Sequence, residues 1–375
     1  MKGLEEFKRY ILIGGGTMAD RLIPQLDGLN IELIGIADNL TSNSRIIKKY
    51  RDFDIVRLSS LKDALLDDET CAVLAVNAFF STAIIKDYGL ITNYSYEKLF
   101  VPNPYTCLRP CVMNDDFASE KRIPTDDEIY SRIRALFSDD VSLKIYDALW
   151  KSKTYDSVED TFELVRFSDI NELYYFEEDY WNTYHFEKAS SEYATVFDCG
   201  AYVGDSIFPL KQVIPEPFLN YYAFEPDATN ASAIRDNKEF YNACNELHVL
   251  EYGVGDKNET LNFVMPNNNQ KDAGRFLDNS CNENALSIAV RRIDDLDLSI
   301  KGKLYIKMDI EGSELPALKG AENTIRSFSP YLAICVYHRK NDMVLIPDFI
   351  NSLGCNYSYY LRGGFHTILW AIPND

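Results

Sequence analysis

The stretch Val196–Ser206 has the sequence VFDCGAYVGDS. An apolar strand, Thr195–Phe197, runs into a turn that contains Gly200 and Gly204, and a helix is expected over Ser206–Gln212. A strand that feeds a glycine turn and then a helix forms the ligand pocket of many α/β folds, because glycines let a ligand approach the backbone and the helix N-terminus offers unpaired N–H groups. The stretch therefore predicts an α/β fold with a pocket at this turn.

The charges around the turn indicate the kind of ligand. Asp198 and Asp205 flank it, and it contains no Lys or Arg. A phosphate cradle would need a basic side chain such as the lysine of the Walker motif. A pocket bordered by carboxylates suits a cationic or zwitterionic cofactor, and S-adenosylmethionine is the candidate. The residues predicted to contact it here are Asp198, Gly200, Ala201, Gly204, Asp205 and Ser206.

Two further strands lead to acids that fit the same ligand. Leu219–Phe224 is a predicted strand, and Glu225 and Pro226 follow it directly. An acid at the tip of the second strand is positioned to accept hydrogen bonds from ribose hydroxyls. The next strand, Leu247–Leu250, leads to Asp256, a candidate acceptor for an adenine amino group. Glu225, Pro226 and Asp256 are therefore predicted to complete the cofactor site.

Together these motifs resemble the FkbM-type S-adenosylmethionine-dependent methyltransferases. In chain order they are FDCGA at 197–201 with Gly204, FEP at 224–226, GVGD at 253–256, KMDIEGSE at 307–314, LKGAE at 318–322 and VYH at 336–338. The resemblance covers roughly the C-terminal half, from about Tyr193. It implies a class I methyltransferase fold, S-adenosylhomocysteine as product, and O-methylation, often of sugar or polyketide hydroxyls.

Methyl transfer to a hydroxyl needs a base, and a positioned base typically contributes about 10²- to 10⁴-fold to the rate. The predicted catalytic residues follow the fourth and fifth strands of this half, Leu304–Met308 and Tyr331–Val336. They are Asp309, Glu311 and His338. Our hypothesis is that His338 or Asp309 is the base, and that Glu311 orients the acceptor or the donor.

The grouped acids Asp309, Glu311 and Glu314 have an alternative interpretation as a Mg²⁺ site. Magnesium usually takes only one or two protein carboxylates and keeps several waters. No metal ligand is therefore predicted, and Mg²⁺ stays an alternative.

The N-terminal part carries a second strand–glycine–helix pattern. The strand Tyr10–Ile13 runs into Gly14–Ala19, which fits G-x-G-x-x-A, and Asp38 follows at roughly the 20-residue distance of a dinucleotide fingerprint. The favoured interpretation is a domain that keeps this turn for packing and positions the catalytic half. Two alternatives stay open: a nucleotide or nucleotide-sugar site with Gly14, Gly16 and Asp38, and an active dehydrogenase. The unit also resembles the small N-terminal domain of some sugar acyltransferases that bind nucleotide sugars.

The chain is predicted to have three parts. They are a Rossmann-like domain at 1–112, a helical, aromatic-rich connector or lid at 113–190, and a class I methyltransferase domain at 191–375. Pro102, Pro104 and Pro110 mark the first boundary. The aromatic run at 174–181, with His185 behind it, is either core that joins two parts or a lid that stacks on sugars. The fold class is α/β: a doubly wound class I sheet whose last strand is antiparallel, preceded by the smaller domain and the connector.

Composition excludes several classes of partner. The chain has 375 residues, 38 basic and 58 acidic side chains, and a net charge of −20. A surface this acidic repels a phosphate backbone, so no nucleic-acid partner is expected. The first residues are too acidic for a signal peptide, and no apolar stretch is long enough to span a bilayer, so no membrane insertion is expected either. The eight cysteines are scattered without a C-x-x-C pair, which predicts a reduced, cytoplasmic protein.

The function predicted from these observations is S-adenosylmethionine-dependent O-methyl transfer to a sugar or glycan precursor, as in polysaccharide biosynthesis. One alternative is a nucleotide-sugar-binding or scaffold protein with an inactive methyltransferase domain. Another is an oxidoreductase that uses the Gly14–Asp38 site. The acceptor, the methylated position and the oligomeric state, including a homo-oligomer, stay open.

Overall fold

The chain forms two compact units in the computed structural model, and each is described by itself. The first contains Met1–Cys111, Ala148–Glu178 and Gly363–His366, and the second contains Val112–Asp147, Asp179–Arg362 and Thr367–Asp375. The structure describes residues 4–15, 17–37, 55–75, 78–102, 126–152, 164–166, 168, 194–207, 218–264, 275–276, 286–339, 341–362 and 367–374.

The first unit is built on a six-stranded sheet with the order β3-β2-β1-β4-β5-β6. Its strands are β1 (Arg9–Ile13), β2 (Glu32–Ala37), β3 (Ile55–Val56), β4 (Thr70–Leu74), β5 (Leu99–Pro102) and β6 (Leu164–Arg166). All neighbours pair in parallel except β6, which runs antiparallel to β5. Strands β1 and β4 lie at the centre and are almost wholly buried, which explains why their sequences are continuously apolar.

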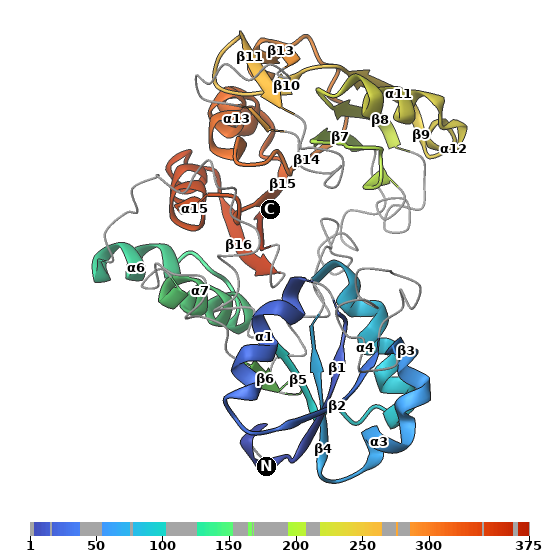
Figure 1. Ribbon diagram of the computed structural model, residues 1–375. Helices are drawn as coiled ribbons and strands as arrows, with labels where there is room; N and C mark the ends of the chain where they lie inside the picture. The colour runs from blue at the N-terminus through green and yellow to red at the C-terminus, as the bar shows by residue number, and fades with distance from the viewer. Residues whose placement is uncertain are drawn as a thin grey trace. The chain divides into compact units, whose positions relative to one another are not determined.

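Helices cover both faces of this sheet. Figure 1 shows α1 (Thr17–Asp27) on one side and α3 (Lys62–Leu66) and α4 (Ala78–Thr92) on the other. The short 3₁₀ helix η2 (Leu58–Leu61) precedes α3. The sequence pattern predicts one helix near Ser60–Leu66, and the structure divides this stretch between η2 and α3.

The second unit is built on a seven-stranded main sheet with the order β16-β17-β15-β14-β7-β8-β9. Its strands are β7 (Ala194–Cys199), β8 (Phe218–Phe224), β9 (Cys244–Leu250), β14 (Lys303–Met308), β15 (Tyr331–Cys335), β16 (Tyr357–Arg362) and β17 (Ile368–Pro373). Strands β7, β8, β9, β14 and β15 are parallel to one another, and β17 is antiparallel to both β15 and β16. The chain therefore crosses from one half of the sheet to the other between β7 and β14.

The sequence of Leu315–Phe328 predicts one helix, and the structure has two here, α13 (Glu314–Gly320) and α14 (Glu322–Phe328). A tertiary contact lies at the break, since a Cβ at Gly320 would lie 1.9 Å from the backbone oxygen of Gly255. Only glycine fits this approach, and the next residue, Ala321, leaves the helical conformation at φ −113° and ψ 12°. The other helices of this unit are α6 (Asp127–Arg134), α7 (Asp140–Ser152, which ends in the first unit), α11 (Ala228–Asp236), α12 (Lys238–Tyr241) and α15 (Asp342–Ser352).

A small separate sheet has the order β10-β13-β11-β12. Its strands are β10 (Gly253–Val254), β11 (Glu259–Val264), β12 (Arg275–Phe276) and β13 (Leu286–Arg291). It packs near α13, as Figure 1 shows and as the Gly255–Gly320 contact requires. Except for β12, the polar segment expected at 266–283 lies outside the described residues.

The segment before α7 lies along β16, the last strand of the main sheet. Ser138 and Tyr359 exchange two hydrogen bonds, from the Ser138 N–H to the Tyr359 oxygen at 2.9 Å and from the Tyr359 N–H to the Ser138 Oγ at 3.2 Å. The Leu361 N–H donates to the Ser142 Oγ at 2.9 Å. Asp139 pairs with Arg362, and one of their contacts spans 2.5 Å. These contacts tie residues 137–142 to the sheet edge.

We expect Gly320→Ala to lower the free energy of unfolding by about 1–3 kcal/mol, the usual cost of an added methyl group in a packed interior. Alanine favours a helix more than glycine does, so a loss of stability would come from the Gly255 contact. Urea unfolding followed by circular dichroism measures it. The control is Asn323→Ala on the exposed side of α14, expected within about 0.5 kcal/mol of wild type. Equal free energies of unfolding for the two variants would show that the approach of Gly255 does not exclude a side chain at residue 320.

Candidate functional site

The turn after β7 depends on two glycines. Gly200 has φ +78° and Gly204 has φ +84°, a left-handed conformation that other residues rarely adopt. A Cβ at Gly200 would lie 1.9 Å from the backbone oxygen of Asp309, and one at Gly204 would lie 2.6 Å from the ring of Phe240. The turn after β7 therefore lies directly against the end of β14. The helix expected over Ser206–Gln212 falls mostly outside the described residues.

Glu225 follows β8 and is bonded to the same turn. Its Oε2 accepts from the backbone N–H of Tyr202 at 2.8 Å, and its Oε1 accepts from the N–H of Asp227 at 2.8 Å and from the Asn230 amide at 3.5 Å. Burial raises the pKa of Glu225 to about 7, although these hydrogen bonds favour the ionised form. A carboxylate offers about four lone-pair positions, so this one has capacity to accept further hydrogen bonds from a ligand.

Asp198 is fully buried at the end of β7 and is held by two neighbouring strands. Its Oδ1 lies 2.9 Å from the Lys307 Nζ, and its Oδ2 accepts from the Tyr221 hydroxyl at 2.5 Å. The same Lys307 ammonium donates to the backbone oxygen of Gly200 at 2.9 Å. Burial lowers the pKa of an amine, but the Asp198 carboxylate outweighs this effect and raises the pKa of Lys307 above its usual value. Asp198 therefore acts on the turn through Lys307.

The other residues predicted to contact the cofactor in this turn differ in exposure. Ala201 is buried and donates its N–H to the backbone oxygen of Phe224 at 3.2 Å. Ser206 is also buried, whereas Asp205 is exposed and Pro226 is half-buried. The structure thus brings the turn residues and Glu225 together at the ends of β7 and β8.

Asp256 follows β10 of the small sheet. It is half-buried, and its backbone oxygen accepts a hydrogen bond from the Arg292 Nη1 at 3.2 Å. No described hydrogen bond joins the Asp256 side chain to the turn after β7.

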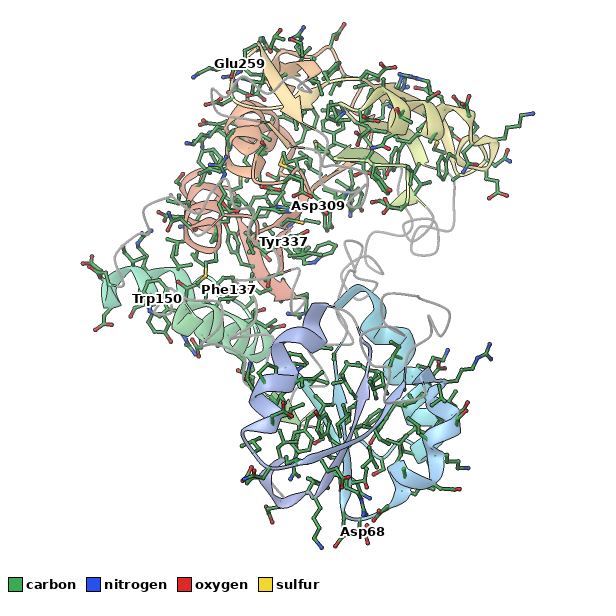
Figure 2. The ribbon with its side chains drawn as sticks, in the orientation of Figure 1. Asp68, Phe137, Trp150, Glu259, Asp309 and Tyr337 are labelled. Carbon is green, nitrogen blue, oxygen red and sulfur yellow. The ribbon has the colours of Figure 1, made fainter. Side chains whose placement is uncertain are left out.

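Four side chains gather at the carboxyl ends of β14 and β15: Asp309, Glu311, Glu314 and His338, here called the His338 cluster. The His338 Nδ1 lies 2.8 Å from the Glu314 Oε1. The His338 Nε2 lies 3.4 Å from the Asp309 Oδ1 and 3.7 Å from the Glu311 Oε2. Tyr337 donates its hydroxyl to the Asp309 Oδ1 at 3.2 Å, and Figure 2 labels both residues. The three residues predicted to be catalytic are therefore brought together.

The loop from Asp309 to α13 positions the carboxylates of the cluster. Glu311 and Gly312 both have positive φ, +54° and +94°. A non-glycine residue in this conformation is strained, and such strain often marks a functional site. The Ile310 N–H donates to the Glu314 Oε1 at 2.9 Å, and the Arg339 Nε donates to the Gly312 oxygen at 2.5 Å. The loop is thus fastened to both α13 and the segment after β15.

The cluster has a buried side and an accessible side. His338 is 2% exposed and Glu314 is fully buried, whereas the side chains of Asp309 and Glu311 are 25% and 28% exposed. Burial lowers the pKa of His338, but the nearby carboxylates, Glu314 first, outweigh it and raise that pKa to about 10. Burial and the Glu314 charge raise the pKa of Asp342 well above its usual value. A ligand would reach the cluster from the Asp309 and Glu311 side.

Sequence analysis did not single out three residues of this site. Lys307 had a usable signal, because a lysine inside an apolar strand is almost never buried unless it is paired. Tyr337 precedes His338 directly, and nothing in its position alone indicates a bond to Asp309. Tyr221 lies in a strand rich in aromatic residues, and the sequence does not show whether it only packs in the core or also donates a hydrogen bond.

Several predictions fall wholly or partly outside the described residues. Of the predicted nucleotide site, Gly14 is described, with φ +97° and its N–H 2.7 Å from the Ala37 oxygen, whereas Gly16 and Asp38 are not. The aromatic run at 174–181 and His185 are not described either. Within the described segments, no helix has the length and apolar character needed to cross a membrane.

Comparison with known proteins gives two matches. Residues 198–359 match the family model of the methyltransferase FkbM domain. Among solved structures, the methyltransferase FkbM from Methylobacillus flagellatus KT is similar, with 20% sequence identity, a TM-score of 0.50, and coverage of 97% of this chain and 90% of that chain. At this identity the likeness shows the fold alone. The search of curated proteins found no match.

The matches agree with the architecture described above. The mixed α/β fold of this chain, with its largely parallel sheets, aligns with the solved structure over 97% of the chain. The family match spans the turn after β7, the loop after β14 and the His338 cluster. Residues 198–359 are thus the part of this chain that is similar to the methyltransferase FkbM domain.

Proposed function

We propose that this protein transfers a methyl group from S-adenosylmethionine to a hydroxyl of a sugar or glycan precursor. The observation that carries the proposal is the direct contact between the turn after β7 and the loop after β14. The Gly200 backbone closes on the Asp309 oxygen, and the Asp309 N–H donates to the Cys199 oxygen at 3.1 Å. A donor site on the turn and an acceptor site at the His338 cluster would therefore adjoin.

The strand order supports a class I methyltransferase arrangement. Starting at β7, the chain adds β8 and β9 on one side and then returns to place β14 and β15 on the other. In open α/β sheets, ligands bind outside the carboxyl ends of the strands where the order reverses. That point lies between β7 and β14, where the turn and the His338 cluster meet.

The residues of the turn fit the methyl donor. Glu225 presents a buried carboxylate that two backbone N–H groups favour in its ionised form, and it suits the paired hydroxyls of a ribose. Gly200 and Gly204 leave the backbone without a side chain at both ends of the turn. S-adenosylmethionine supplies, when bound, a methyl group on a positively charged sulfur, and the exposed carboxylate of Asp205 is compatible with that charge.

The residues of the His338 cluster fit the acceptor. Asp309 is accessible, and its Oδ1 is positioned by the Tyr337 hydroxyl and lies near the His338 Nε2. We assign it as the group that would accept the proton of the acceptor hydroxyl while that oxygen takes the methyl group, the sulfur–methyl bond of the donor breaks and S-adenosylhomocysteine leaves. Glu311, also accessible, would hold a neighbouring hydroxyl of the acceptor. The choice of a sugar follows from the family resemblance.

We expect Glu225→Gln to weaken S-adenosylmethionine binding at least tenfold, which is about 1.4 kcal/mol, because an acceptor for the ribose hydroxyls is replaced by a donor. Isothermal titration calorimetry measures this. The matched control is Glu259→Gln on the exposed edge of β11, labelled in Figure 2, which should bind as wild type does. No binding to the wild-type protein at millimolar donor would overturn the proposed function.

Donor binding should also depend on pH through Glu225. Its pKa is raised to about 7, so the carboxylate is protonated and loses acceptor capacity as the pH falls below this value. The dissociation constant of S-adenosylmethionine should therefore rise between pH 8 and pH 6 in the wild-type protein. In Glu225→Gln, the dissociation constant should change less with pH. Identical pH profiles for the two proteins would show that Glu225 does not contact the donor.

Asp309→Asn should lower kcat by about 10²- to 10⁴-fold, the usual contribution of a general base. The donor dissociation constant should stay within about threefold, since the substitution leaves the Glu225 contacts intact. The assay follows S-adenosylhomocysteine release over a panel of sugar nucleotides and oligosaccharides, with Glu322→Gln on the exposed side of α14 as the control. A kcat close to wild type in Asp309→Asn would remove this residue from the role of base.

A further inference from the structure

The His338 cluster has the composition and spacing of a metal site. One ligand atom from each of Asp309, Glu314 and His338 lies within 4.8 Å of the other two. An imidazole and several carboxylates are the donor set that divalent transition metals commonly take. In the sequence, the grouped acids alone do not predict a metal ligand. The structure shows that the buried His338 lies beside these acids.

The two nitrogens of His338 face different carboxylates, and this decides which of them would bind an ion. In metal sites, the histidine nitrogen that does not bind the ion donates its proton to a carboxylate or a carbonyl. The Nδ1 of His338 has such a partner in Glu314, at 2.8 Å. The Ile310 N–H also donates to the same Glu314 oxygen, which holds this carboxylate in place. The Nε2 is therefore the nitrogen presented to a metal.

The spacing around the Nε2 agrees with shared coordination. Two ligand atoms that each lie about 2.1 Å from one ion at a tetrahedral angle are separated by about 3.4 Å. The Asp309 Oδ1 lies 3.4 Å from the His338 Nε2, and the Glu311 Oε2 lies 3.7 Å from it. Glu311 is not among the residues whose ligand atoms already lie within 4.8 Å of one another, so its accessible side chain must turn toward the Asp309 carboxylate for all three atoms to share one ion.

A second observation concerns Glu314. It is fully buried, and its Oε2 has no hydrogen-bond partner among the described residues. The Oε1 of this carboxylate is bonded to His338 and Ile310, but the buried Oε2 has neither solvent nor such a partner, which is costly and leaves part of the negative charge uncompensated. A divalent cation on the other side of His338 would offset this charge through the imidazole.

We infer that the His338 cluster binds one divalent transition-metal ion, of which Zn²⁺ is the first to test, through the His338 Nε2, Asp309 and Glu311. Glu314 orients the imidazole and does not bind the ion directly. The nitrogen ligand disfavours Mg²⁺ and Ca²⁺, which prefer oxygen. Water or the acceptor hydroxyl would complete the coordination. Binding of the ion does not depend on the proposed function. The role of the ion does rest on that function: it would lower the pKa of the acceptor hydroxyl beside Asp309.

The test is calorimetric titration of the untagged full chain with Zn²⁺, after a chelator has been used and removed, without donor or acceptor. We expect one Zn²⁺ per chain, at least tenfold weaker binding in Glu311→Gln, and a 10- to 100-fold loss in Glu314→Gln, where the imidazole loses its partner. His338→Gln should bind no ion at this site. Glu322→Gln, which alters a surface acid paired with Arg326, should bind as wild type does, and Mg²⁺ should give no saturable binding.

The absence of saturable Zn²⁺ binding in the wild-type protein would overturn the inference and leave His338 as an imidazolium held by carboxylates. Equal binding in wild type and Glu311→Gln would do the same, because the ion would then lie elsewhere. If His338→Gln does not fold by circular dichroism, the two glutamate variants decide. S-adenosylmethionine titrations with chelator present test the donor site separately, so failure of the metal site and failure of the proposed function give different results.

Discussion

The second unit depends on one buried ion pair. Asp198 lies near the end of β7, and Lys307 lies near the end of β14. The strand order of the main sheet reverses between these two strands. Removing one partner of such a pair leaves an unpaired buried charge, which typically costs about 3–5 kcal/mol. Lys307 also donates to the oxygen of Gly200, so the pair fixes the glycine turn as well as the two strands. Tyr221, on β8, donates its hydroxyl to the same carboxylate, which links a third strand to the ion pair.

The candidate site follows from this arrangement. With β7 and β14 fixed in register, Gly200 closes on Asp309, and the loop after β14 must turn sharply through Glu311 and Gly312 to enter α13. The first residue of α13 is Glu314, which reaches His338 beyond β15. Each side chain of the cluster is therefore positioned by backbone that is already constrained elsewhere. Such pre-positioning is what catalysis and ion binding both require.

Local pattern was sufficient to predict much of the fold and of the site. Leu219–Phe224 and Leu304–Met308 lie within observed strands, because buried parallel strands are continuously apolar and end in turn residues. The grouping of Asp309, Glu311 and His338 follows from the rule that parallel strands end at one edge of a sheet. What could not be predicted depends on tertiary contacts. The close approach of Gly320 to the distant Gly255, at the break between α13 and α14, is one such contact, and no helical periodicity records it.

The partners of Asp198 show the same limit. In sequence, this acid borders the glycine turn and resembles a ligand contact, because its partners lie in other strands. Asp256 is likewise close to the third strand in sequence, and yet it follows a strand of a separate sheet. Sequence patterns place such residues at strand ends. They do not determine which of them face a ligand and which face the core.

The contacts along β16 have a consequence for solubility. An outer strand of a sheet exposes backbone N–H and C=O groups that can pair with a strand of another molecule, which leads to aggregation. Here the N–H groups of Tyr359 and Leu361 are already bonded to Ser138 and Ser142, from a segment more than 200 positions earlier. A fragment that begins at residue 191 would lack this cover and would present β16 as an open template for intermolecular pairing. The helical segment before the methyltransferase domain thus protects the finished sheet from self-association.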